Sequence, residues 1–374
     1  MNKNQRDQEK IERTNGVGSI TFEKIIRTAR IRSPLEDFAI VEQPVEYRKD
    51  PLTNHLSRIN ALRAERVKQA SSADNPEYIK NIEIVIEKSG QKCFFCPENL
   101  LSATPCFPEE LNVGKRITIG DFSLFPNLFV FSQYHAVGTL GREHFTPLNK
   151  FSKEVWAQAI EGSQRFFQAV YDYDAQAQFP SINFNFLPPS ASSIVHPHIQ
   201  IIQDAQPTEL TAKLLQASRK YTENGQERRN YWLDLISSEK QIKKRFIFEN
   251  EYMAWLASFS PFGKNEIIGI VKSPTTDILQ ITQEDIVALG EGISTALKAV
   301  YLGRGVRSVN MAMYFGPINV NYSDSYRIHL RIVSRPTLMP NYTGDIGFME
   351  LLHSETIGEA TPEVIASSLK EHFQ

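Results

Sequence analysis

The chain has 374 residues, of which 41% are hydrophobic and 22% charged, and its 41 basic and 43 acidic residues leave a net charge of −2. This composition is that of a globular protein long enough for two domains, and it gives no electrostatic reason to expect nucleic acid or an anionic membrane as the main partner. No apolar run approaches transmembrane length, and the polar start MNKNQRDQEKIERTNG is unlike a signal peptide, so a cytoplasmic protein is expected.

The N-terminal part of the chain is polar and then basic. Residues 1–18 are rich in Asn, Gln, Lys and Glu, which predicts a flexible tail. Further on, residues 57–70 carry Arg63 and Arg66. Such arginines most often form a solvated face, but their planar donor forks are also suited to clamping a phosphate. The residues alone leave both interpretations open.

A cysteine pair follows at Cys93 and Cys96, in the short segment CFFC. Three cysteines in the whole chain are too few for a disulfide framework, so in a reducing compartment this spacing indicates metal or redox chemistry. A zinc site needs two further ligands from elsewhere in the chain. Two buried thiols without a metal are the alternative.

The middle of the chain alternates between strand and helix patterns. Residues 117–139 are rich in aromatic and β-branched residues with Gly and Pro breaks, which predicts strands joined by turns. Apolar positions at helical spacing predict a helix over residues 152–171, with Ser152 as its N-cap. Residues 181–186 alternate as a strand, and residues 208–240 have the pattern of polar helices.

The most informative stretch is HPHIQ, residues 196–200, which follows a polar loop. If this stretch is extended, His196, His198 and Gln200 project from one face. Two imidazoles held in this way can divide the work: one ligates a metal or orients its neighbour, and the other is a neutral nucleophile near pH 7. A pair of strand histidines bonded to the backbone is the alternative.

The second part of the chain is a weak copy of the first. The segment EGSQRFFQAVY from Glu161 reappears as EGISTALKAVY from Glu291. Two further pairs of segments match at nearly the same offset: VFSQYHAVGTLGREH with PFGKNEIIGIVKSPT, and SINFNF with SVNMAM. Three matches in one order indicate a duplicated supersecondary unit, and hence two related α+β domains. The second copy lacks the cysteine pair and retains one histidine, His329, in its closing strand, so chemistry is expected in the first copy.

A Cys-x-x-Cys pair, a lone downstream histidine and a His-Pro-His-x-Gln motif in a duplicated α+β chain resemble the galactose-1-phosphate uridylyltransferase family of the histidine-triad superfamily. The resemblance runs from about Tyr47 to near the C-terminus, and its most specific parts are DPLTNHLSRINALRAER, CFFCPEN and SASSIVHPHIQ. It implies two tandem histidine-triad-like domains, each an antiparallel sheet with flanking helices. The catalytic domain would span residues 19–235 and a degenerate domain residues 236–374.

The same resemblance implies a structural zinc ion held by Cys93, Cys96, His144 and His196. His144 is preferred over His135 because the family's ligand has a Leu four residues on and a Ser eight residues on, as His144 has; His135 fits a non-ligand position in the preceding strand. Two thiolates and two imidazoles close the coordination of zinc and leave no position for an activated water. The zinc is therefore expected to give rigidity.

The family's nucleophile corresponds to His198. Its attack on the α-phosphorus of a nucleotide ester would form a phosphoramidate and divide one displacement into two easier ones. Gln200 stands where hydrolytic relatives carry a third histidine. Because an amide donates a hydrogen bond but delivers no proton, this residue favours transfer to a second phosphate over attack by water.

The family's phosphate contacts match Asn185, Ser193 and Gln200, and two arginines near the phosphates match Arg63 and Arg66. Without the family match, ordinary turn chemistry would explain Asn185 and Ser193.

Two positions bear on the substrate. A ribose-binding aspartate matches Asp121, although the usual Asn before it is Gly120 here, and a loop cap is an equal alternative for Asp121. Where relatives have Gly-Tyr-Glu and bind the hexose, this chain has Gly347, Phe348 and Met349, with Glu350 one place late. Phe348 is therefore the candidate sugar contact, and the sugar itself stays open.

The resemblance implies an enzyme: a nucleotidyltransferase with a covalent nucleotidyl-histidine intermediate. Its simplest form is a uridylyltransferase of galactose metabolism that moves UMP between sugar 1-phosphates. The alternatives are a phosphorylase or adenylyltransferase acting on ADP-sugars or dinucleoside polyphosphates, and a nucleotide-binding protein without catalysis. Expected partners are a nucleotide sugar and a sugar 1-phosphate, phosphate or pyrophosphate, bound by a cytoplasmic homodimer.

Overall fold

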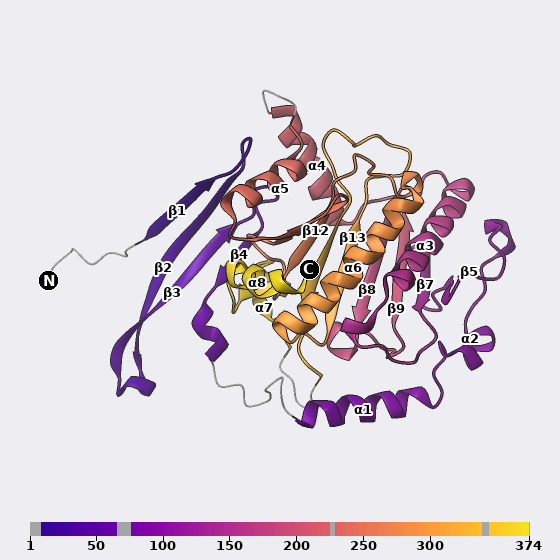
Figure 1. Cartoon of the computed structure of the whole chain (residues 1–374), viewed down its shortest axis with the longest axis horizontal. Coiled ribbons are helices and arrows are strands. Elements are labelled where there is room, and N and C mark those ends of the chain that lie inside the picture. The colour runs from indigo at the N-terminus through magenta and orange to yellow at the C-terminus, as the bar shows by residue number, and fades with distance from the viewer. Residues whose placement is uncertain (1–8, 66–75, 225–228, 339–343, 374) are drawn as a thin grey trace.

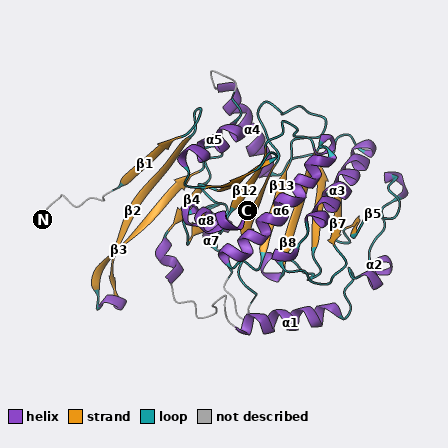
Figure 2. Cartoon of the chain, in the orientation of Figure 1, coloured by secondary structure: helices purple, strands orange, loops and turns teal. Residues whose placement is uncertain are grey.

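A computed structural model describes residues 9–65, 76–224, 229–338 and 344–373 of the chain. Within these residues the strands form a ten-stranded and a five-stranded sheet, with helices beside them (Figures 1 and 2). The fold is α+β, as the sequence predicts; the larger sheet is antiparallel, and the smaller one contains a single parallel pair among its described strands.

Every neighbouring pair of strands in the larger sheet is antiparallel. In spatial order the strands are β10 (Phe246–Glu249), β11 (Met253–Ala257), β12 (Ile267–Val271), β14 (His329–Ser334), β13 (Val309–Tyr314), β8 (Phe179–Phe186), β9 (His198–Asp204), β7 (Tyr134–Leu140), β6 (Phe122–Pro126) and β5 (Ile117–Ile119).

The larger sheet consists of two halves with the same arrangement. In the first half, strands β5, β6 and β7 precede a long helix, which β8 and β9 follow; in the second, β10, β11 and β12 precede a long helix, which β13 and β14 follow. The halves meet where β8 pairs with β13, with Asn185 opposite Asn310. This arrangement confirms the duplication predicted from the sequence.

The two long helices, α3 (Lys153–Tyr173) and α6 (Gln283–Arg304), lie side by side over one face of the larger sheet (Figure 1). α3 begins as predicted, because the Ser152 hydroxyl accepts the Val155 N–H at 3.2 Å. A Cβ on Gly290 of α6 would lie 2.5 Å from the carbonyl oxygen of Lys153, so the close crossing of the helices requires glycine there. Apolar side chains of the strands fill the space beneath them.

Helix α6 is long and apolar enough to cross a membrane by length and composition alone, which corrects the expectation that no apolar segment approaches that length. More than half of its most apolar window, 56%, is buried inside the protein. Ile293, Ala296 and Leu297 have no exposed surface and belong to the main core. Its apolar character is therefore explained by packing against α3 and the sheet.

The smaller sheet contains β1 (Lys10–Asn15), β2 (Thr21–Ser33), β3 (Ala39–Lys49), β4 (Leu56–Ile59) and β15 (Thr356–Gly358). β2 and β3 extend from the body as a long ribbon (Figure 1). Strand β1 lies within the expected N-terminal tail, so the tail prediction does not hold from Lys10 onward; most of the residues before it lie outside the described part.

Strand β15, near the C-terminus, pairs in parallel with β4, near the N-terminus. The ends of the chain therefore share one sheet, while the two repeats share the other. The domain boundary between residues 235 and 236 stays a prediction. The other helices are α1 (Pro76–Gly90), α2 (Pro97–Ala103), α4 (Glu209–Asn224), α5 (Tyr231–Ile242), α7 (Phe348–Leu352) and α8 (Pro362–Leu369).

Candidate active site and metal centre

Cys93, Cys96, His144 and His196 come together, and one ligand atom from each lies within 4.8 Å of all the others. The cysteines precede α2, His144 follows β7 and His196 lies just before β9. Cys96 Sγ is 3.4 Å from His144 Nδ1 and 3.6 Å from His196 Nδ1. Because a tetrahedral zinc ion with ordinary Zn–S and Zn–N bonds separates such atoms by about 3.6 Å, the donor set fits a metal ion.

Hydrogen bonds on the far side of both imidazoles orient their Nδ1 lone pairs toward the cysteines. The Ser89 hydroxyl donates to Val85 O at 2.6 Å and therefore accepts from His144 Nε2 at 2.8 Å. His196 Nε2 donates to Gly141 O at 3.2 Å. Such outer contacts fix the tautomer of metal-binding histidines.

The protonation states of the cluster also suit a cation. Burial lowers the pKa of His144, and it lowers the pKa of His196 to about 4, so both rings are neutral at pH 7. Burial, followed by the neighbouring Cys93, raises the pKa of the Cys96 thiol to about 12. The Cys96 thiol therefore needs a bound cation in order to ionise near pH 7.

His198 is the first residue of β9, and a hydrogen bond fixes the tautomer of its ring. Its Nδ1–H donates to the His196 carbonyl oxygen at 2.8 Å, which leaves the lone pair on Nε2. No described residue forms a hydrogen bond with this Nε2 atom. The side chain is only 6% exposed, and burial lowers its pKa. The Phe95 ring packs edge-on against it at 5.2 Å between centroids.

The expectation that His196, His198 and Gln200 share one face stays a prediction. Strand β9 begins at His198, and His196 lies two residues before it, in the metal cluster. The Phe95 ring lies near both imidazoles, at 5.2 Å from His198 and 6.4 Å from His196 between centroids.

A row of polar side chains lines the sheet face opposite α3. Ile199 and Ile201 belong to the core beneath α3, so His198 and Gln200, which alternate with them, face the other side. The register of β8 with β9, continued by one residue, sets Asn185 opposite His198. Asn185 Oδ1 accepts a hydrogen bond from an amide of the second repeat, Asn310 Nδ2, at 2.5 Å.

The other predicted contacts are less well placed. Ser193 is exposed in the loop before His196. Arg63, Asp121 and Phe348 form no hydrogen bond, ion pair or ring contact with the metal cluster or His198 in the described ranges, and Phe348 is 67% exposed. Asp121 lies at the β5–β6 turn, where its backbone N–H donates to Gln158 at 3.1 Å. Arg66 lies outside the described residues.

Three residues near the site were not predicted to act there. Ser89 holds His144, Phe95 packs on His198, and His135 Nε2 lies 3.1 Å from Gln200 Oε1. The spacing of His135 and Gln200 on paired strands could have revealed their contact, once β7 and β9 were known to be neighbours. Nothing local marks Ser89, because its partner is 55 residues away.

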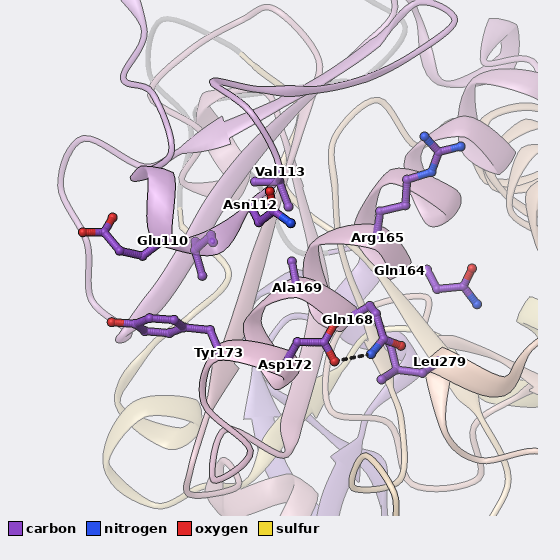
Figure 3. Close-up of a pocket in the computed structure, with 11 residues that line it drawn as sticks. Glu110, Asn112, Val113, Gln164, Arg165, Gln168, Ala169, Asp172, Tyr173 and Leu279 are labelled. Carbon is purple, nitrogen blue, oxygen red and sulfur yellow. Dashed lines mark hydrogen bonds between the residues drawn. The ribbon is translucent and has the colours of Figure 1, made fainter.

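A groove lies elsewhere, along α3. It has a volume of about 640 Å³, and its lining includes Gln164, Arg165, Gln168 and Asp172 of α3 and the loop residues Asn112 and Val113 (Figure 3). None of the predicted site residues lines it. Its one internal hydrogen bond, from Gln168 to Asp172 at 2.8 Å, is an ordinary helical pair.

Several solved structures share this fold. An ADP-glucose phosphorylase from Arabidopsis thaliana with bound ADP-glucose has a TM-score of 0.68 and 17% identity, covering 87% of this chain and 99% of its own. A GalT-like protein from the same plant has a TM-score of 0.65 and 16% identity, covering 87% and 98%. A uridylyltransferase has a TM-score of 0.62 and 18% identity, covering 88% and 98%.

Sequence comparison adds one full-length relative. An uncharacterized protein of Archaeoglobus fulgidus is 29% identical over 352 residues, which cover 94% of this chain and 98% of the relative. No protein-family model matches the chain.

Fold and site together define a two-repeat α+β protein with a Cys2His2 cluster beside a buried strand histidine. This is the fold of the GalT-like proteins, so the resemblance predicted from the sequence is confirmed at the level of the fold.

Proposed function

We propose that the chain is a nucleotidyltransferase in which Nε2 of His198 takes a nucleoside monophosphate from a nucleotide sugar and passes it to a second phosphate. The observation that carries the proposal is the fixed tautomer of this histidine. Nδ1–H is committed to the His196 carbonyl, so the lone pair on Nε2 is available on the face that Gln200 shares. A neutral imidazole of this kind is a nucleophile that needs no separate base.

The reaction runs in two displacements. The Nε2 lone pair attacks the α-phosphorus, the P–N bond forms, and the P–O bond to the leaving sugar 1-phosphate breaks with its electron pair on that oxygen. An oxygen of the acceptor phosphate then attacks the same phosphorus, and the P–N bond breaks to return the lone pair to Nε2. No proton has to be delivered to the leaving group, which agrees with an amide at position 200.

Donors around the phosphorus supply the stabilisation in this scheme. Gln200 and Asn185 lie on the face of His198, and Ser193 and the arginines Arg63 and Arg66 are proposed to approach when the nucleotide binds. Hydrogen bonds and positive charge directed at the non-bridging oxygens reduce their repulsion of the nucleophile. Asp121 is proposed as the ribose contact.

We further propose that the metal is zinc. Two thiolates and two imidazoles form a closed tetrahedral set, so the ion supplies rigidity and no activated water. Its ligands Cys96 and His196 place Phe95 and the His196 carbonyl against the ring of His198. The cluster thereby holds the groups that set the tautomer of the nucleophile.

For the transferred group we first propose UMP, which the enzyme would move between hexose 1-phosphates. A second candidate is an ADP-sugar phosphorylase, and it is supported by the higher TM-score of the plant ADP-glucose phosphorylase, 0.68 against 0.62 for a uridylyltransferase. In both cases the donor is a nucleotide sugar and the acceptor carries a phosphate.

A cytoplasmic homodimer is also part of the proposal. Phe348, Leu351 and Leu352 of α7 are 67–74% exposed, which is unusual for a monomer and suits a second copy of the chain. Sedimentation at several protein concentrations measures the oligomeric state, and a concentration-independent monomer would remove this part of the proposal.

The test uses zinc-replete protein incubated with UDP-glucose or ADP-glucose labelled in the α-phosphate. We expect one of the two to label the protein in an acid-labile form, and the label to move to added sugar 1-phosphate or inorganic phosphate. Preferential labelling by ADP-glucose, with release by phosphate, would select the second candidate. Tight binding of either nucleotide sugar without any label would identify a nucleotide-binding protein and reject the proposed catalysis.

A further inference from the structure

We infer that His135 is a positioning residue that decides which end of the Gln200 side-chain amide faces the reacting phosphate. The inference rests on the proposed function, in which Gln200 donates to a phosphate oxygen. The inference adds His135, which lies outside the HPHIQ stretch and orients the Gln200 amide.

The contact is short and buried. His135, on β7, is 4% exposed, and its Nε2 lies 3.1 Å from Gln200 Oε1 on β9. The register pairs Val137 with Gln200, so His135 reaches the amide diagonally across the two strands. Both side chains lie on the face that carries His198.

The hydrogen-bond pattern fixes the tautomer of His135. The backbone N–H of Phe131 donates to Nδ1 at 3.4 Å, so Nδ1 holds the lone pair and Nε2 carries the hydrogen. Burial lowers the pKa of His135, which favours this neutral form. Nε2–H therefore donates to the oxygen of Gln200.

One neighbour could compete for the same nitrogen. Asn127 Nδ2 lies 3.1 Å from His135 Nε2, but two N–H groups do not form a hydrogen bond with each other. Asn127 Oδ1 cannot take its place, because it already accepts the Phe129 N–H at 3.1 Å. The Gln200 oxygen is thus the acceptor for His135.

This arrangement has a direct chemical consequence. With its oxygen held by His135, Gln200 can turn only its NH₂ group toward the nucleotide, where it donates to an anionic oxygen. The opposite orientation would place a carbonyl oxygen against the phosphate and repel it. The isolated side chain has little preference between the two, so the choice is made by His135.

The second repeat supports this reading of the contact. Glu266 and Arg331 lie 131 residues after His135 and Gln200, and β12 pairs Ile268 with Arg331 as β7 pairs Val137 with Gln200. Glu266 and Arg331 form an ion pair. The same diagonal contact therefore exists in both halves, and in each half it holds the side chain at the third polar position of the closing strand.

The test is a series of substitutions at His135, measured by the rate of His198 nucleotidylation with saturating donor. His135→Gln keeps a donor near the position of Nε2 and should stay within about threefold of the wild type. His135→Leu removes the donor and should lose about tenfold, the value of one ordinary hydrogen bond. His135→Glu presents an acceptor that turns the amide around, and should lose about 10²- to 10³-fold.

Two controls separate positioning from a structural role. Donor affinity, zinc content and melting temperature should change little in His135→Gln and His135→Leu, so that the loss appears in the rate. In a Gln200→Ala background the three substitutions should have equal rates, because there is no amide left to orient. Equal rates for His135→Gln, His135→Leu and the wild type, or unequal rates in the Gln200→Ala background, would overturn the inference.

A readout without activity keeps the inference separate from the proposed function. Nitrogen-15 NMR of labelled histidine in the wild-type protein, assigned by the signal missing from His135→Gln, should show hydrogen on Nε2 of His135. Hydrogen on Nδ1 would overturn the inference even in an active enzyme. Failure of the wild type to become labelled by any nucleotide sugar would reject the proposed function, and the tautomer would still be measured.

Discussion

The two repeats hold one histidine in the same way and surround it differently. His198 and His329 both donate Nδ1–H to the carbonyl oxygen two residues earlier, at 2.8 Å and 3.0 Å. In the second repeat, however, the ring of His329 stacks between Trp232 at 4.0 Å and Tyr314 at 5.0 Å. Its Nε2 is fully buried, and no residue in the described ranges forms a hydrogen bond with it. The strand sets the tautomer, and the neighbours decide whether the remaining lone pair can react.

The repeats also differ in what stabilises them. The first half contains the Cys2His2 cluster. At the edge of the second half, the guanidinium groups of Arg48 and Arg245, both nearly fully buried, share the carboxylate of Glu363. The Cys2His2 cluster of one half thus has a network of ion pairs as its counterpart in the other. Separate substitutions can disrupt the metal cluster and the ion-pair network, so the contribution of each to stability can be measured.

The largest expected effect comes from removing the metal. We expect one zinc ion per chain, lost in Cys93→Ser and in His144→Ala, with a large fall in melting temperature, because zinc binding to such sites is worth about 10 kcal/mol or more in small domains. Metal analysis and calorimetry measure both quantities. Cys106→Ser is the matched control, since Cys106 is exposed and outside the cluster. Freshly prepared, chelator-free protein without zinc would contradict this prediction.

Next in size is the loss of the nucleophile. His198→Ala should reduce nucleotidyl transfer by about 10⁴-fold or more while the protein stays folded, because the reacting atom is removed. His198→Gly supplied with an imidazole nucleotide should recover part of the second half-reaction. As the counterpart in the second repeat, His329→Ala should keep its turnover per folded molecule and lose about 2–4 kcal/mol of stability through the emptied stack. Wild-type-like turnover by His198→Ala would refute the mechanism.

The third prediction exchanges residues between the repeats. Arg331→Gln leaves the buried carboxylate of Glu266 without its cation, which should cost about 3–5 kcal/mol in the free energy of unfolding. The double substitution Glu266→His with Arg331→Gln reproduces the His135–Gln200 pair of the first repeat and should recover much of this loss. Urea unfolding measures both variants. A double variant no more stable than Arg331→Gln would show that the two contacts are not interchangeable.

The fourth prediction concerns acid stability. Burial alone would raise the pKa of Glu363, but hydrogen bonds from Arg48 and the charges of Arg48 and Arg245 hold it at about 2. A carboxyl with a lowered pKa stabilises the fold fully above its ordinary value of 4.5, and this contribution, at most about 3 kcal/mol, is lost as the pH falls toward 2.

The fall in stability between pH 4.5 and 2 should therefore be smaller in Glu363→Gln than in the wild type. Glu42→Gln is the control, because the Glu42–Arg30 pair is largely exposed and such pairs contribute little. If the free energy of unfolding depends on pH in the same way in the wild type and in Glu363→Gln, Glu363 does not contribute to the loss of stability in acid.

The smallest effect is expected in the choice of sugar. By the family resemblance, Phe348 and Met349 stand where relatives carry groups that could bond sugar hydroxyls, and an apolar surface there would discriminate weakly, by roughly 10- to 200-fold. Glu350 is occupied, since it accepts the N–H groups of Gly347 and Ile357 at 2.9 and 3.0 Å. The ratio of kcat/KM for glucose 1-phosphate and galactose 1-phosphate measures the discrimination. A preference above about a thousandfold for galactose 1-phosphate would show that these residues do not govern the acceptor.

Local patterns in the sequence predicted much of the first repeat. The Ser152 cap and the apolar spacing after it identified α3, and the alternation of residues 181–186 identified β8. Both depend on neighbours within a few residues. The position of His144 in the metal cluster followed from the family resemblance, which no local spacing supplies.

The features that were missed depend on contacts between distant parts of the chain. Strand β1 is polar in sequence and becomes a strand by pairing with β2. The pairing of Thr356 with Ser57 joins the two ends of the chain, and the contact of Ser89 with His144 links residues 55 positions apart. A single sequence carries no local signal for any of these contacts.

The junction between β8 and β13 bears on how such a chain arises in evolution. Two equivalent strands that pair antiparallel at the centre of one sheet have the geometry of a twofold-symmetric dimer, in which each copy covers the open edge of the other. Fusion of the two copies into one polypeptide frees them to diverge, since only one must keep the reactive histidine accessible. Separated again, each half would expose a full strand edge with an apolar face and would tend to associate with another copy of itself.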